Sequence, residues 1–88
     1  MPVNNSSVSV GTAVTEVSGP SISSKLVYLQ DGDYDGDTAV YVGGDSVTTS
    51  NGVKLSKTNT TVFQINADDA LYAIGDGATA AVRVTEVL

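Results

Sequence analysis

Short β-branched segments make up most of this sequence, and glycine, asparagine or proline interrupts them at close intervals. Fourteen Val, ten Thr and three Ile give 27 β-branched residues among 88. Their stiff side chains suit the half-buried surface of a sheet better than a helix. Turn signals recur roughly every 8 to 12 residues, which is typical of sandwiches and barrels. The sequence therefore predicts an all-β fold, a compact β-sandwich or jelly-roll-like barrel of seven to eight short strands.

The chain is expected to form one domain that follows a short arm. Residues 1–7 are polar apart from Met1, Pro2 and Val3, and we expect them to form a flexible N-terminal arm. Strand patterns begin at Val8, so residues 8–88 form the predicted single β domain. A chain of this size buries about 60–65% of the surface that its unfolded form exposes, which leaves room for one core.

Three segments carry the clearest strand patterns. Residues 22–30 have apolar side chains on both faces, which predicts a central strand that is covered on both sides. Residues 60–66 and 79–87 alternate between apolar and polar side chains, which predicts strands with one face toward the core.

Glycine, asparagine and aspartate residues predict the main turns. Asn51-Gly52 lies between strand-like residues 47–49 and 53–55, and this pair favours a type I′ hairpin turn. Residues 66–69 favour a tight turn over a single helical turn. Residues 75–80 match the letters of a dinucleotide-binding fingerprint, but a β-rich segment follows where that site needs a helix. We therefore expect a turn between the last two strands there.

Composition disfavours several classes of function. The chain has no Cys, so it can form neither a disulfide framework nor a thiolate metal site. Ten acidic residues against four basic ones give a net charge of −6, which would repel nucleic acid. No apolar run approaches the ~20 residues of a membrane span, and the N-terminus lacks the features of a signal peptide. We expect a protein made in a cytoplasm and used without secretion, with neither nucleic-acid nor membrane partners, and small domains of this kind often form homo-oligomers.

The acidic segment 31–37 is the one place where charges converge. Asp31, Asp33, Asp35 and Asp37 follow the spacing of the first half of a calcium-binding loop. The second half of that motif is missing, because Val42 stands where the loop needs a bidentate glutamate. Two interpretations stay open: a solvated turn that needs no cofactor, and a weak calcium site that a neighbouring subunit or water completes.

No catalytic residues are predicted. His and Cys are absent, and no serine lies in a nucleophile elbow, so we do not expect an enzyme. The four tyrosines have two interpretations. Tyr28, Tyr34, Tyr41 and Tyr72 could stack on sugars, or they could pack within and beside the core with their hydroxyls in water.

Several segments together resemble a known family. They are Val8–Thr12, Val40–Gly44, Val47–Gly52, Leu71–Ile74 and Val82–Val84, in this order. As a set they resemble small all-β virion structural proteins of tailed bacteriophages, of the head decoration (cement) or head-fibre type. The acidic segment is longer and more charged than the short turn that this family leads us to expect.

The resemblance implies a capsid decoration protein that binds the outer surface of the head and stabilises the shell. The implied partner is the major capsid protein, and a homotrimer would match the threefold positions of an icosahedral shell. The expected capsid contacts are the residues of the arm: Met1, Pro2, Val3, Asn4, Asn5, Ser6, Ser7 and Val8. The alternatives are a head-fibre base or tail-associated module that recognises host-surface glycans, and a cellular carbohydrate-binding or adhesin module.

Overall fold

The structure, a computed structural model, describes residues 3–32, 38–77 and 79–88. In these residues it contains eight strands and no helix. The strands are β1 (Val3–Val10), β2 (Thr15–Ser18), β3 (Lys25–Asp31), β4 (Val40–Gly43), β5 (Val53–Lys54), β6 (Thr61–Ile65), β7 (Leu71–Gly75) and β8 (Ala80–Val87). Consistent with this, no helix in the described part of the chain is long and apolar enough to cross a membrane.

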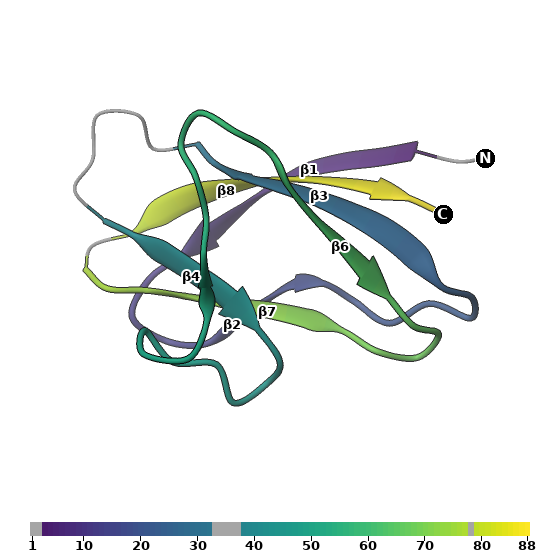
Figure 1. Ribbon diagram of the computed structural model, residues 1–88, viewed down its shortest axis with the longest axis horizontal. Helices are drawn as coiled ribbons and strands as arrows, with labels where there is room; N and C mark the ends of the chain where they lie inside the picture. Colours follow the sequence, from purple (N-terminus) through teal and green to yellow (C-terminus); the bar gives the residue numbers. More distant parts are fainter. Residues whose placement is uncertain (1–2, 33–37, 78) are drawn as a thin grey trace.

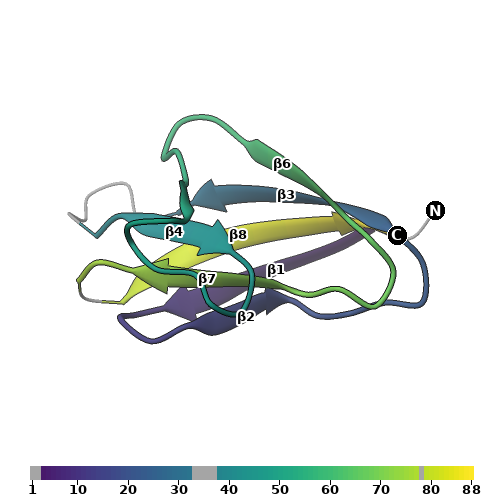
Figure 2. The ribbon, with the colours of Figure 1, turned by 60° about the horizontal axis from the view of Figure 1, so that its bottom comes forward.

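The strands form two antiparallel sheets that pack face to face (Figures 1 and 2). Sheet A has the order β1-β8-β3-β6, and sheet B has the order β2-β7-β4-β5. The chain crosses between the sheets at every connection except the one from β4 to β5. Both termini lie at the same end of the molecule, because Val3 pairs with Val87 (Figure 1). This architecture confirms the predicted all-β sandwich of seven to eight strands.

The core lies between the two sheets and consists mainly of aliphatic side chains. Strand β3 shows the pattern clearly, since alternate side chains along it are buried while those between them are exposed or half-buried. Strand β8 repeats this alternation over its first five residues. The buried cluster comprises Val10, Val17, Val27, Leu29, Val40, Val42, Leu55, Ile65, Leu71, Ala73, Ala80, Val82 and Val84.

The position of β3 agrees with the prediction in one respect and differs in another. β3 lies between β8 and β6, so the predicted central position is confirmed. Its two faces are unequal, however. Val27 and Leu29 are fully buried, whereas Leu26, on the opposite face, is 38% exposed. Among the described residues no second layer covers that face, because all the strands of sheet B pack on the other side.

The predicted flexible arm is ordered from Val3 onward. Residues 3–10 form β1, and each pairs with a residue of β8, from Val3 opposite Val87 to Val10 opposite Ala80. Pairing depends on backbone hydrogen bonds, which polar side chains such as Asn and Ser do not prevent. The hydrophobic pattern missed this strand because most of its side chains are exposed on both faces. Met1 and Pro2 lie outside the described residues.

The predicted type I′ hairpin at Asn51-Gly52 is wrong. β5 pairs with β4 and not with residues 47–49, so the loop of this hairpin spans residues 44–52. Neither Asn51 nor Gly52 has the positive φ that a type I′ turn requires. Instead, the backbone N–H groups of Asn51 and Gly52 both donate to the Thr48 carbonyl, at 3.3 and 3.0 Å. The Asn51 side chain accepts a hydrogen bond from the Thr48 N–H at 2.7 Å.

Gly52 is required for close packing. A Cβ atom at this position would lie 2.8 Å from the Cβ of Tyr41 and 2.8 Å from Cγ2 of Val47. We expect Gly52→Ala to lower the free energy of unfolding by about 1–3 kcal/mol, because the Cβ of Tyr41 is fixed to the backbone of β4 and the side chain of Val47 is buried. Gly44→Ala in the same loop is the control, since a Cβ there meets no atom within 4 Å. Urea denaturation of both variants checks this, and equal stabilities would contradict it.

The turn at residues 66–69 and the connection between the last two strands agree with the predictions. Residues 66–69 form a tight turn in which the Asp69 N–H donates to the Asn66 carbonyl at 3.2 Å, and Asp68 adopts a φ of 67°. Short Asp side chains tolerate this left-handed conformation better than bulky ones. The segment that matched the dinucleotide fingerprint connects β7 to β8, as predicted.

Candidate interaction surface

The outer face of sheet A carries a group of exposed apolar side chains. Val3 is 55%, Leu26 38% and Val62 49% exposed, and Tyr28 and Val87 are half-buried. We call these five residues the outer apolar cluster. They come from all four strands of sheet A and lie near the end where the termini meet.

Strand register explains why these side chains share one face. Val3, Val87 and Leu26 lie opposite one another across β1, β8 and β3. Tyr28 and Val62 are opposite each other in the next row of the same face. Rows on one face of a sheet lie close enough for side chains to contact across and diagonally. The cluster is therefore a contiguous apolar area, of a kind that marks interaction sites more often than scattered residues do.

Strand β1 forms the free edge beside this cluster. Of the expected capsid contacts, Val3, Asn5 and Ser7 are on the outer face of sheet A, and Asn4, Ser6 and Val8 are on the inner face. All of them except the half-buried Val8 are exposed. The Thr85 hydroxyl donates to Oδ1 of Asn5 at 2.8 Å and adds a side-chain link between β1 and β8. Three of the six described residues of the predicted contact segment thus lie on one surface with the outer apolar cluster.

The acidic segment is described only in part. Asp31 is the last residue of β3 and is fully buried, where the prediction had placed it in an exposed turn. Its backbone N–H donates to the Ser56 carbonyl at 3.0 Å. Asp33, Asp35 and Asp37 lie outside the described residues, so the calcium site stays a prediction.

The tyrosines do not form one common face. Tyr28 lies on the outer face of sheet A, whereas Tyr41 and Tyr72 lie on the outer face of sheet B. All three are half-buried. Tyr34 lies outside the described residues. Any sugar-binding surface built from the described tyrosines would therefore use one sheet only.

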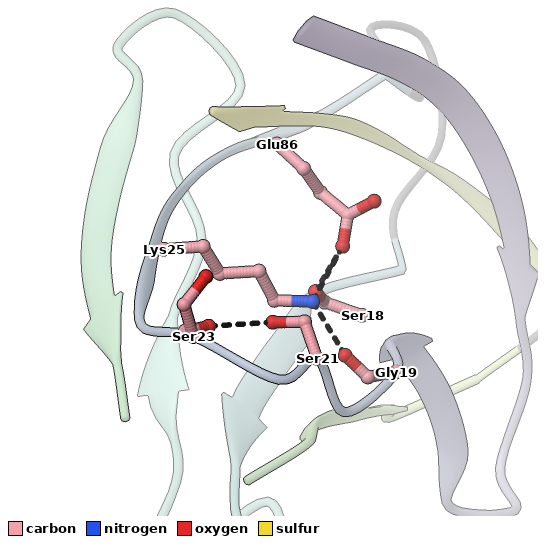
Figure 3. A network of polar contacts seen from close by, with 6 residues as sticks. All are labelled: Ser18, Gly19, Ser21, Ser23, Lys25 and Glu86. Atoms are coloured by element: carbon pink, nitrogen blue, oxygen red, sulfur yellow. Dashed lines mark hydrogen bonds and ion pairs between the residues drawn. The ribbon is translucent and has the colours of Figure 1, made fainter. Parts of the chain in front are cut away.

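Lys25 of β3 and Glu86 of β8 form an ion pair (Figure 3). It lies at the end of the sandwich where the termini meet. Nζ of Lys25 lies 2.8 Å from Oε2 of Glu86, and the same nitrogen donates to the Gly19 carbonyl. The Ser18 hydroxyl donates to the same Glu86 oxygen. The side chain of Lys25 is 3% exposed and that of Glu86 is 21% exposed. Because Ser18 belongs to sheet B and the ion pair to sheet A, this network ties the two sheets together.

The network also changes the protonation of Glu86. Partial burial raises the pKa of Glu86, but the hydrogen bonds from Lys25 and Ser18 and the positive charge of Lys25 outweigh it. The net result is a pKa below the ordinary value of 4.5. Glu86 is therefore ionised at neutral pH, and its charge compensates that of the buried Lys25.

A surface pocket of about 580 Å³ lies beside β7 and the turn at residues 66–69. Its lining includes four carboxylates, from Glu16, Asp45, Asp68 and Asp69. Among the described residues, however, no three acidic, histidine or cysteine side chains are grouped so that they could hold a metal ion. The pocket is thus an acidic hollow without a defined ligand set.

Sequence reasoning found neither the ion pair nor the outer apolar cluster. A signal for the ion pair was present, because Lys25 continues the inward alternation of Val27 and Leu29, and Glu86 continues that of Val82 and Val84. Two charges at inward positions require partners. Which residues pair depends on the order of the strands, and the alternation does not contain that order.

No protein-family model, no curated protein and no solved structure matches this chain. The fold and surface described above define it as a small all-β sandwich domain with an exposed apolar cluster and a free edge strand.

Proposed function

We propose that this protein is a bacteriophage virion component, a capsid decoration protein that binds the outer surface of the head and stabilises the shell. The motifs that resemble small virion proteins lead to this proposal. The observation that supports it best is the outer apolar cluster, which lies on the same surface as Val3, Asn5 and Ser7 of the predicted contact segment. The proposed partner is the major capsid protein.

The physical properties of the chain suit this role. A net charge of −6 favours the solubility of free subunits until they reach the shell. Burial of apolar surface contributes about 25 cal/mol per Å², so the five partly exposed side chains of the cluster supply a modest affinity for each subunit. Modest contacts that span adjoining capsid subunits add up across the shell. In this proposal the protein stabilises the head by binding across adjoining capsid subunits, and it catalyses no reaction.

Binding to phage heads that lack the protein tests this proposal. We expect the purified protein to pellet with such heads and to form ordered density on their outer surface in cryo-electron microscopy. Replacing Leu26 and Val62 together with serine should weaken binding about tenfold or more, because each loses roughly 1 kcal/mol of apolar burial.

Val53→Ser is the matched control for this test. Val53 is 51% exposed, close to the 49% of Val62, but it lies on sheet B. It should bind heads as the unmodified protein does. The proposal fails if the unmodified protein does not bind heads, or if the double variant binds as well as the control.

A further inference from the structure

Strand β1 is the longest and least protected edge of the two sheets. Natural proteins protect sheet edges with short strands, bulges, proline or charged residues, because free backbone groups pair with other chains. In sheet B, β2 has four residues and a shift in register, and β5 has two residues, one of them Lys54. In sheet A, β6 has five residues, whereas β1 has eight.

None of these protective features occurs in β1. Its sequence from Val3 to Val10 contains only Val, Asn and Ser, so it has neither charge nor proline. Its pairing with β8 continues from end to end without a bulge. Alternate residues of such a strand direct their N–H and C=O groups away from the sheet. The small side chains allow another strand to approach closely.

We propose that β1 pairs antiparallel with β1 of a second copy of this chain, so that the two A sheets become one continuous eight-stranded sheet. A strand that matches this edge best has a free edge of its own, no charged residue and a similar length. Among the described strands, β1 of a second copy meets these three requirements. This inference does not depend on the function proposed above.

The register of this pairing is limited by the two faces of the sheet. Because side chains alternate, residues that lie opposite each other in a continuous sheet must be on the same face in both copies. Two registers satisfy this condition while pairing most of β1. In one, Ser6 lies opposite Ser6 of the other copy, and in the other, Ser7 lies opposite Ser7. Both place a twofold axis perpendicular to the sheet at its centre, and a contact of this kind closes at two copies.

Charge also favours this surface for self-association. Two copies, each with a net charge of −6, repel one another over most approaches. Contact through β1 brings no charged side chain of that strand against the other copy. The remaining repulsion acts at a distance and is screened by salt. Dimerisation should therefore become stronger as salt concentration rises, where an interface built on ion pairs would weaken.

The geometry of the pair has a consequence for binding. The twofold axis places the outer faces of both A sheets on the same side, so the two outer apolar clusters form part of one broad surface. One strand pair buries less area than a standard stable interface. The expected dimer is therefore weak and depends on protein concentration. It differs from the homotrimer that symmetry matching on a capsid led us to expect.

Sedimentation equilibrium over a range of concentrations tests the inference. We expect the mean mass to rise from that of the 8.9 kDa chain toward twice this value, and to do so at lower concentration in higher salt. Ser7→Lys should weaken the association about tenfold or more, because a lysine on a strand edge opposes pairing and the two lysines meet near the axis. The same substitution reduces the net negative charge of each copy, so its loss of association cannot come from increased overall repulsion.

Gln64→Lys is the matched control, since it makes the same charge change on the same face of sheet A, on strand β6 at the opposite edge. It should dimerise like the unmodified protein. Circular dichroism melts verify that both variants fold, and amide hydrogen exchange of β1 should slow as concentration rises. A monomer under all conditions, a trimer mass, or equal association of the two variants would overturn the inference. Head binding is measured separately, so failure here leaves the proposed function standing.

Discussion

Leu29→Ala is expected to lower the free energy of unfolding by about 2–5 kcal/mol, because it leaves a cavity in the middle of the core. Leu29 is fully buried and lies on β3, opposite Val84 on one side and Thr61 on the other. A domain of this size is stable by only about 4–13 kcal/mol. The substitution therefore removes a large part of the total stability, and urea denaturation followed by circular dichroism measures it.

Leu26→Ala is the control for this prediction. It removes the same atoms from the same strand three residues away, but Leu26 faces outward and is 38% exposed. Its effect should stay below about 1.5 kcal/mol, because part of the side chain is in water in the folded state. Equal losses for the two variants would show that both faces of β3 are covered, as the sequence pattern had predicted.

Glu86→Gln is expected to lower the free energy of unfolding by about 1–3 kcal/mol, because it leaves the buried ammonium of Lys25 without a counter-charge. The loss is smaller than for a fully buried pair, since water reaches part of the Glu86 side chain. Adding Lys25→Met should recover stability, because the double variant buries no charge at this point. A double variant less stable than Glu86→Gln alone would contradict this account of the ion pair.

The pH dependence of stability gives an independent measurement of the same network. Because the pKa of Glu86 is lowered in the folded protein, its contribution is fully present above the ordinary value of 4.5. It is lost as pH falls through the lower, folded-state pKa. The stability difference between the unmodified protein and Glu86→Gln should therefore shrink below pH 4.5. A difference that stays constant down to low pH would mean that the charge of Glu86 does not stabilise the fold.

The prediction was most accurate where side-chain pattern and burial coincide. β8 alternates between buried and exposed residues along its first five positions, and the pattern predicted this strand to within one residue at its start. The turns on either side of β7 were likewise predicted, because glycine and short polar residues bound a compact apolar segment there. At such positions the local sequence and the tertiary structure favour the same conformation.

The prediction failed where a strand or turn depends on a distant partner. β1 is mostly exposed, so its side chains carry no burial pattern, and backbone pairing with β8 holds it in place. The prediction of a type I′ turn at Asn51-Gly52 failed for a related reason, because β5 pairs with β4 and not with the residues just before the turn. The outer apolar cluster could not be predicted either. Its members come from four strands whose order is not contained in any local segment.

By itself the sequence determined the class of fold, the approximate number of strands and the inward face of the strands predicted at residues 60–66 and 79–87, because β-branched alternation and turn residues act over a few positions. Only the tertiary structure decided which strands are neighbours. That order left β1 at an open edge and placed Lys25 of β3 beside Glu86 of the neighbouring strand β8. It also brought the outer apolar cluster together on an exposed face. Strand order depends on contacts between residues far apart in the chain, and local patterns do not encode these contacts.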